Sequence, residues 1–123
     1  MERFIKREDC WLDTQTGLEW ELSQSKEKFN YENAIKYCES LGADWRLPIR
    51  PELESVLNLE KYDPATDLPD TVSSGYWSAT TDAFNTDYAW DVYFRSGYVF
   101  DYGKSNALYV RAVRGGGEKW IKN

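Results

Sequence analysis

The segment AWDVYFRSGYVFDY, residues 89–102, alternates apolar and polar side chains on both sides of a central turn. Trp90, Val92 and Phe94 occupy every second position, and an Arg-Ser-Gly tripeptide follows them. Successive side chains of a β-strand point to opposite faces. The spacing therefore predicts two half-buried antiparallel strands joined by a tight turn.

The second of these strands carries three aromatic rings on one face. Tyr98, Phe100 and Tyr102 alternate with Val99 and Asp101. The sequence leaves open whether the aromatic face is exposed or packed in the core, because Asp101 would be unusual in a core and Val99 unusual on a surface.

Strand patterns continue on either side of this pair. A short apolar run precedes it at residues 76–81, and residues 108–113 follow it with Leu108, Val110 and Ala112 at alternate positions. We therefore expect the last third of the chain to form an antiparallel meander.

Two helices are predicted further upstream. Asn30 is a suitable N-cap for a helix that ends before Gly42, and apolar residues recur between them at helical spacing. Pro51 suits the first turn of a second helix, whose apolar face continues through Leu57. Residues 62–74, rich in Pro, Asp, Thr and Ser, are expected to form a long loop.

The N-terminal segment is predicted to be a β-hairpin. Apolar positions between Phe4 and Leu22 flank a turn-type cluster at residues 13–17. The order hairpin, helix, helix, loop and meander predicts an α+β architecture. A chain of 123 residues fits one core, so we expect a single domain over residues 1–118 and a tail at residues 119–123.

Charge and composition narrow the classes of partner. The formal net charge of −6 disfavours nucleic acid and anionic membranes, which need a positive field. No apolar run approaches the roughly 20 residues that span a bilayer. The charged start of the chain does not have the pattern of a secretory signal, so we expect a cytoplasmic location, with a phage-borne product or an excised domain as alternatives.

Neither catalysis nor metal binding is predicted. The chain has no histidine, which removes the commonest general base and a frequent zinc ligand. Asp82, Asp87, Asp91 and Asp101 raise the hypothesis of a calcium site, since calcium takes six to eight oxygen ligands. Their spacing singles out no metal-binding loop. We therefore expect no metal, no cofactor and no enzymatic activity.

Several blocks of the chain, in this order, resemble the Lcl C-terminal domain family of bacterial and phage proteins. The blocks are residues 13–20, 34–41, 44–48, 76–78, 89–94 and 109–115. The resemblance implies a C-type-lectin-like fold, shared with carbohydrate- or protein-binding modules and with the variable receptor proteins of diversity-generating retroelements. It brings no activity with it, because a shared fold is weak evidence for function.

The chain departs from the family pattern at two positions. Ala112 stands where the family usually has a cysteine, and Ile49 stands where relatives tend to have a capping threonine. If the helix cysteine normally pairs with that strand cysteine, Cys38 has lost its partner. Cys10 is a possible replacement, and two free buried thiols are the preferred interpretation.

Arginines occur in two motifs with alternative roles. The tetrad at residues 45–48 contains Arg46 beside a tryptophan, and the last predicted strand contains Arg111 and Arg114. These guanidinium groups could hold an anionic ligand. We favour structural roles, with Trp45 and Leu47 in the core and Arg46 paired with a carboxylate.

The segment from Thr80 to Asn106 is the best candidate for function, because its Tyr and Asn side chains suit a recognition surface. We predict a non-catalytic module that binds a protein or glycan there. The alternatives are a structural or assembly subunit, for instance of a phage particle, and a variable receptor of the retroelement type. The predicted ligand-binding residues are Asp82, Phe84, Asn85, Asp87, Tyr88, Tyr98, Phe100, Tyr102 and Asn106.

Overall fold

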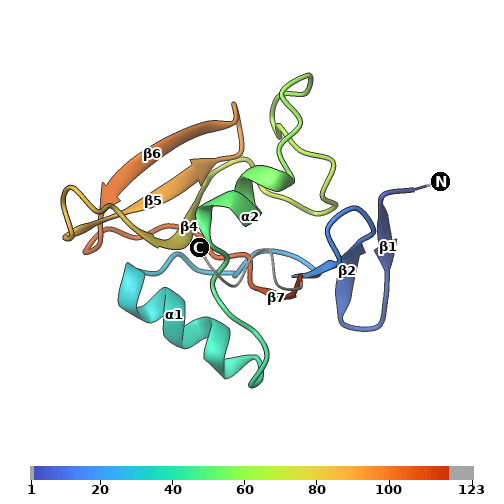
Figure 1. The fold of residues 1–123 in the computed structure, drawn as a ribbon, viewed down its shortest axis with the longest axis horizontal. Coiled ribbons are helices and arrows are strands. Elements are labelled where there is room, and N and C mark those ends of the chain that lie inside the picture. Colours follow the sequence, from blue (N-terminus) through green and yellow to red (C-terminus); the bar gives the residue numbers. More distant parts are fainter. Residues whose placement is uncertain (1, 117–123) are drawn as a thin grey trace.

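Two antiparallel sheets and two helices make up residues 2–116, the part of the chain that the computed structural model describes (Figure 1). The first sheet has the strand order β1-β2-β3-β7, and the second has the order β4-β5-β6. The predicted domain end at residue 118 and the tail at residues 119–123 lie outside the described residues. In chain order the elements are β1 (Phe4–Lys6), β2 (Cys10–Asp13), β3 (Leu18–Glu21), α1 (Tyr31–Ser40), α2 (Arg50–Ser55), β4 (Gly75–Thr81), β5 (Tyr88–Tyr93), β6 (Tyr98–Gly103) and β7 (Val113–Gly115).

The N-terminal segment forms three strands, β1, β2 and β3, one more than the single hairpin that the sequence predicts. The turn between β2 and β3 lies where expected, with Gly17 at φ 78°. The buried carboxylate of Asp13 organises this turn, because it accepts hydrogen bonds from the backbone N–H of Gln15 and the hydroxyl of Thr16, both at 2.9 Å. Asp13 also pairs with Arg3 at 2.8 Å, so the turn is tied to the segment that leads into β1.

Both predicted helices are confirmed, and local signals set their ends. The side chain of Asn30 accepts a hydrogen bond from the N–H of Asn33 at 2.9 Å, which caps α1. Helix α2 has no side-chain cap at Ile49. Instead, the carboxylate of Glu52 accepts the Ile49 N–H at 2.9 Å, half of the usual capping box.

The structural interpretation of the tetrad at residues 45–48 is confirmed. Trp45 and Leu47 are buried in the core. The guanidinium of Arg46 donates to both carboxylate oxygens of Glu52, each at 2.7 Å. This bidentate pair fixes the entry to α2 and engages both terminal nitrogens of the guanidinium.

The last predicted strand, residues 108–113, is wrong in its extent. Only Val113 of that segment belongs to a regular strand, β7. The stretch before it is extended, but its hydrogen bonds alternate between two partners. Tyr109 bonds to β4 on one side, whereas Leu108 bonds to Phe29 on the other, so no continuous ladder forms with either neighbour.

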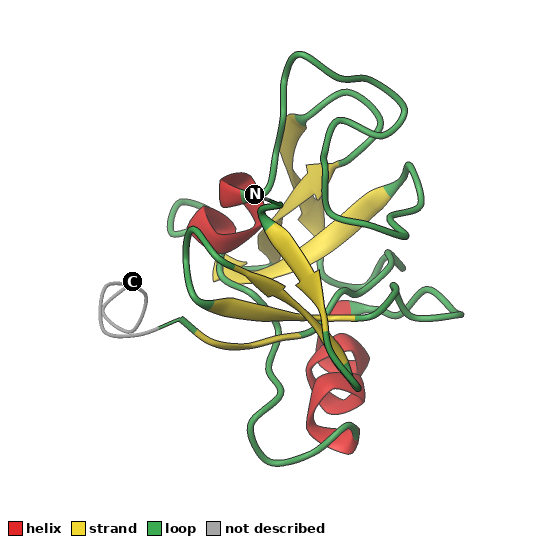
Figure 2. Ribbon diagram, turned by 90° about the vertical axis from the view of Figure 1, so that its right-hand side faces the viewer, coloured by secondary structure: helices red, strands yellow, loops and turns green. Residues whose placement is uncertain are grey.

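The core consists of two hydrophobic clusters, one on each side of this crossing segment. The first joins the N-terminal sheet, α2 and one face of the second sheet, and includes Trp20, Leu53 and Tyr76. The second lies under α1 and includes Cys38 and Trp77. Accordingly α2 packs on β4 and β5, whereas α1 lies apart from it and contacts β4 (Figure 2).

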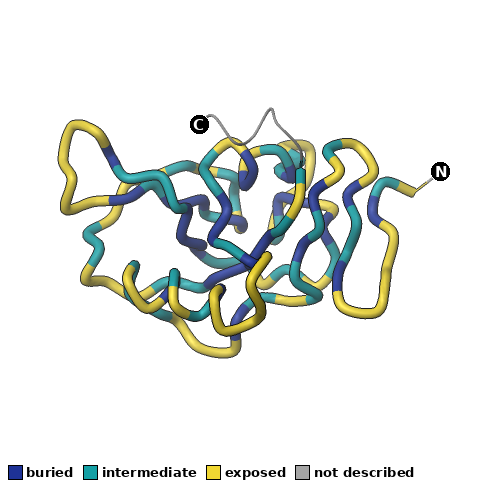
Figure 3. The backbone as a smooth tube through the Cα atoms, turned by 60° about the horizontal axis from the view of Figure 1, so that its bottom comes forward, coloured by how far each residue is buried: buried dark blue, intermediate teal, exposed yellow. Residues whose placement is uncertain are grey.

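The surface is most exposed in the connections. The loop between β4 and β5 protrudes at the left of Figure 3 and is exposed from Ala83 to Asp87. Within residues 2–116, no helix has the length and hydropathy needed to cross a membrane.

Candidate functional site

The second sheet has one face in the core and one face that is only partly covered. Strand register places the side chains of Asp91 and Tyr93 on the same face as Phe100 and Tyr98, because Asp91 pairs with Phe100 and Tyr93 with Tyr98. Val99 points the other way and packs against the first core cluster. The conflict that the sequence left open is therefore resolved: the aromatic face of β6 is exposed, and Asp101 is tolerated on the opposite face because β6 is an edge strand.

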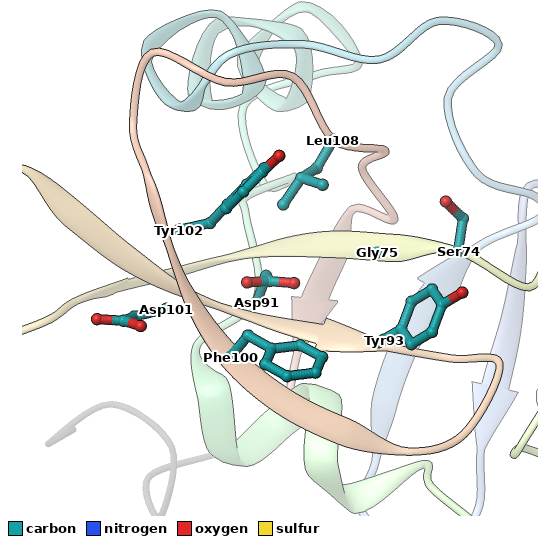
Figure 4. A pocket seen from close by; sticks show the side chains of 8 residues that line it. All are labelled: Ser74, Gly75, Asp91, Tyr93, Phe100, Asp101, Tyr102 and Leu108. Carbon is teal, nitrogen blue, oxygen red and sulfur yellow. The ribbon is translucent and has the colours of Figure 1, made fainter.

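A pocket of about 390 Å³ lies on this partly covered face (Figure 4). Strands β4, β5 and β6 form its floor, and the segment that follows β6 contributes Leu108 as a wall. Beyond Leu108 the face is closed, because Trp77 and Ala89 are buried in the second core cluster. The pocket is lined by Ser74, Gly75, Asp91, Tyr93, Phe100, Asp101, Tyr102 and Leu108.

Asp91 is the unusual group at the centre of this pocket. Its residue is only 5% exposed, and its Oδ1 is buried without a hydrogen-bond partner. Burial, together with the nearby charge of Asp101, raises the pKa of the Asp91 carboxyl to about 7. In Figure 4 the carboxylate of Asp91 points between the rings of Phe100 and Tyr102, whereas the side chain of Asp101 points away from the pocket.

Aromatic rings form most of the wall around this carboxylate. The ring centroids of Tyr93 and Phe100 lie 6.5 Å apart, and those of Tyr102 and the buried Trp77 lie 6.3 Å apart. Phe100 is 48% exposed and Tyr102 is 43% exposed. The rings therefore offer accessible faces to a ligand that enters the pocket.

Gly75 keeps the floor of the pocket open. A Cβ at this position would lie 3.1 Å from Cδ2 of Leu108 and 3.4 Å from Oδ2 of Asp91. Any larger residue would therefore fill the space in front of the carboxylate.

The nine predicted ligand-binding residues fall into two groups in space. Phe100 and Tyr102 line the pocket, and Tyr98 lies beside it, with its ring 6.1 Å from that of Phe100. The remaining six lie at the other end of the sheet, around the β4–β5 loop and the turn after β6. They are Asp82, Phe84, Asn85, Asp87, Tyr88 and Asn106.

Within that second group, polar side chains form hydrogen bonds to the backbone of their own loop or turn. The carboxylate of Asp82, a largely buried residue, accepts the N–H of Phe84 at 2.9 Å, and Asn85 accepts the N–H of Asp87 at 3.3 Å. Asn106 donates to the carbonyl of Gly103 at 3.1 Å. The ring of Phe84 is 99% exposed at the tip of the loop.

Six residues of the pocket are absent from the predicted ligand-binding set: Ser74, Gly75, Asp91, Tyr93, Asp101 and Leu108. In the sequence, Asp91 and Asp101 are candidates only as members of the four-carboxylate set that raises the calcium hypothesis. The available signal was a charged residue in the middle of a run of aromatic and apolar residues, on a strand that becomes central to its sheet.

The two arginines of the last predicted strand, Arg111 and Arg114, form hydrogen bonds within the domain. Arg114 bonds to Glu19 at 2.6 Å and to Asp9 at 2.8 Å, and its guanidinium carbon lies 4.3 Å from the centroid of the Trp45 ring. The donors of the buried Arg111 all face backbone and hydroxyl oxygens. Among residues 2–116, no three Asp, Glu, Cys or His side chains gather as a metal site would require.

Cys10 and Cys38 are both unpaired and buried in the second core cluster, which also contains Ala112. Burial raises the pKa of the Cys38 thiol to about 12 and also raises that of Cys10. Since the thiolate is the reactive form, neither residue has the environment of a nucleophile.

We therefore expect the native thiols to react with Ellman's reagent at pH 8 at least about 100-fold more slowly than in 6 M guanidinium chloride, because unfolding exposes them and restores their ordinary pKa. A Ser40→Cys variant provides the control, since Ser40 is exposed on α1. Native wild-type thiols that react as fast as this added cysteine would contradict the buried placement.

The fold and the pocket define a small α+β domain. One of its sheets carries a pocket that is lined by aromatic rings and has the Asp91 carboxylate at its floor. Residues 9–114 match the sequence profile of the Lcl C-terminal domain family, and the chain belongs to that family. The resemblance carried by the sequence blocks is thus confirmed. A search of curated protein sequences finds no match to the chain.

Proposed function

We propose that this domain is a non-catalytic binding module of C-type-lectin-like fold, and that its ligand enters the pocket around Asp91. One observation carries the proposal: a carboxylate oxygen without a partner lies buried beneath exposed aromatic rings. The pairing of β3 with β7, which brings both ends of the domain into one sheet, supports the fold assignment.

An unpartnered carboxylate is costly to maintain. Nearly all buried polar groups in folded proteins have hydrogen-bond partners, and a buried charge without one lowers stability by several kcal/mol. A preformed concave site lined by aromatic rings, with few polar groups, is the usual form of a ligand pocket. The carboxylate of Asp91 is therefore best explained as a group that a ligand completes.

Binding is favoured over catalysis by the arrangement of carboxylates. A raised pKa at Asp91 suits a general acid, but glycoside hydrolysis needs a second carboxylate on the same substrate. The side chain of Asp101 points away from the pocket (Figure 4). The chain also has no histidine to act as a base. We propose no cofactor for this site.

The ligand is proposed to be a protein or a glycan, bound by Phe100 and Tyr102 from the predicted set and by Asp91 and Tyr93 in addition. A second candidate, an assembly contact, is favoured by the fully exposed ring of Phe84 at the tip of the β4–β5 loop. The two candidates place function at opposite ends of one sheet, so matched variants separate them.

The test is a comparison of wild type, Phe100→Ala/Tyr102→Ala and Phe84→Ala on the same arrays of immobilised peptides and glycans. Both rings of the double variant are about half exposed, so we expect it to fold, which circular dichroism checks. We expect signals to fall at least about tenfold in the double variant and to persist in Phe84→Ala, because losing two hot-spot rings costs more than about 1.4 kcal/mol.

Loss confined to Phe84→Ala would move the function to the loop and support the assembly contact. Equal signals from all three proteins, or no signal from wild type on either array, would overturn the pocket as the binding site.

A further inference from the structure

The polar and aromatic groups of the pocket match one class of ligand. We propose that the pocket binds the ammonium group of a lysine side chain presented by a partner protein, an assignment that rests on the proposed binding function of the same site.

The lining of the pocket contains acidic but no basic side chains. Asp91 lies at the floor, and none of the eight lining residues is basic. Asp101 also lines the pocket, but its carboxylate points away from it (Figure 4). The chain as a whole carries a formal net charge of −6. A cationic side chain would restore the ion pair that Asp91 lacks and would be attracted by the surrounding field.

The placement of the aromatic rings also favours a cationic side chain as the ligand. The rings of Tyr93, Phe100 and Tyr102 stand around the carboxylate in Figure 4. A cation close to the face of an aromatic ring is attracted by the ring quadrupole, and the apolar stem of a lysine packs against the same rings. An aromatic recess with a carboxylate at its floor thus addresses both parts of the lysine side chain.

The geometry of Asp91 favours an ammonium group over a guanidinium group. Arginine binds a carboxylate best through two parallel hydrogen bonds, which need both oxygens. Oδ1 of Asp91 is buried, whereas Oδ2 lies beside Gly75, 3.4 Å from the position that a Cβ of that residue would take. A compact point charge with rotatable donors can use a single oxygen. The volume of about 390 Å³ also lies at the small end of ligand pockets, which suits one side chain.

A neutral sugar fits less well. Its ring could stack on Phe100 or Tyr102, but its hydroxyls need several polar partners. The side chains facing the pocket supply only the Asp91 carboxylate and the hydroxyls of Ser74, Tyr93 and Tyr102. A neutral ligand would also leave the charge of Asp91 unpaired.

The experiment is a titration of the ¹⁵N-labelled protein at pH 8 with four probes, followed by two-dimensional NMR. The probes are an acetylated and amidated pentapeptide with lysine between two glycine pairs, its arginine and norleucine analogues, and methyl α-glucoside. We expect the lysine peptide to shift the amides of Gly75, Asp91 and Tyr102. We expect the norleucine analogue to bind at least tenfold more weakly and the arginine analogue at least threefold more weakly.

Variants and pH supply the controls. Asp91→Asn should weaken lysine-peptide binding at least tenfold, and Phe84→Ala should leave it unchanged. Binding should also strengthen at least tenfold from pH 5.5 to pH 8. The reason is that the lysine stays protonated over this range, whereas Asp91, whose pKa is raised by burial to about 7, becomes ionised. The other titratable groups that line the pocket are Asp101 and the hydroxyls of Tyr93 and Tyr102.

The remaining outcomes each decide a different point. Binding of the glucoside that Phe100→Ala abolishes and Asp91→Asn preserves would keep the binding function and overturn the lysine assignment. Equal or tighter binding of the arginine or norleucine analogue would also overturn it. No shift at the pocket amides with any probe would overturn both proposals.

Discussion

Replacement of Arg111 by alanine is expected to lower the free energy of unfolding by about 4 kcal/mol or more. Arg111 is 2% exposed, and its guanidinium has no carboxylate partner among its hydrogen bonds. Its donors instead reach the carbonyls of residues 21, 22, 69 and 70 and the hydroxyl of Thr71, at distances between 2.7 and 3.4 Å. One side chain thereby holds the end of β3 against the long loop before β4.

The size of the effect follows from what alanine leaves behind. Hydrogen bonds from charged groups contribute about 1.5–3 kcal/mol each, and each buried acceptor left without a partner costs about 1–3 kcal/mol. Since domains are stable by only about 5–15 kcal/mol, the variant should lose a large share of its stability and its Tm should fall by at least about 10 °C. Urea unfolding followed by tryptophan fluorescence measures the change.

Two further variants identify the cause of the Arg111 effect. Arg111→Lys keeps a charge but supplies three donors in place of five, so we expect an intermediate loss. Arg7→Ala serves as the exposed control: its ion pair with Glu19 spans 3.8 Å at the surface, and removing it should cost less than about 0.5 kcal/mol. A loss below about 1 kcal/mol for Arg111→Ala would show that the loop is held by other contacts.

Elements fixed by local chemistry were predictable from the sequence. The cap at Asn30 and the C-terminal Gly42 determine where α1 begins and ends, and both act within a few residues of the chain. The turn at residues 13–17 and the hairpin turn before Tyr98 are equally local. Propensity and periodicity are sufficient for such features because their partners are near in sequence.

Features set by distant segments were not predictable. The segment around Leu108 alternates its hydrogen bonds between β4 and Phe29, so its apolar alternation does not produce a regular strand. The path of this segment also determines which part of the pocket-bearing face of β5 is covered. The part at Ala89 is buried in the second core cluster, whereas the part at Asp91 lines the pocket. The residues next to Asp91 in the sequence do not indicate where the segment around Leu108 passes in the fold.

The resulting conflict at Asp91 connects stability with function. A charged group on a central strand, without a partner, breaks the rule that buried polar groups are satisfied, and such violations concentrate at functional sites. Arg111 shows the opposite case, because all three of its guanidinium nitrogens donate to oxygens of the protein. Burial alone therefore does not mark the site. Within residues 2–116, the uncharged side chains of Trp11, Trp20, Gln24 and Ser96 also hold a buried polar atom without a partner, and Asp91 differs from them in having an ionisable carboxyl.

Replacement of Asp91 by asparagine is expected to stabilise the domain at pH 8 while leaving its stability at pH 4 nearly unchanged. The folded state raises the pKa of this carboxyl from 3.8 to about 7, so folding favours the protonated form. The resulting penalty is absent below pH 4, grows as the pH rises to about 7 and is constant above that. One pKa unit corresponds to about 1.36 kcal/mol, which places the full penalty at roughly 4 kcal/mol.

The measurement is the free energy of unfolding in urea at pH 4, 5.5, 7 and 8, taken as variant minus wild type, so that titrations common to both proteins cancel. Asp67→Asn is the control of opposite sign: Lys61, at 2.8 Å, lowers the pKa of Asp67, so this variant should be slightly less stable than wild type above pH 4. A destabilised Asp91→Asn at pH 8 would mean that the carboxylate supports the fold. A stabilised variant that no longer binds ligand would instead show that the wild-type carboxylate lowers the stability of the domain and is needed for binding. Such a loss of stability at a functional position is a common trade-off in proteins.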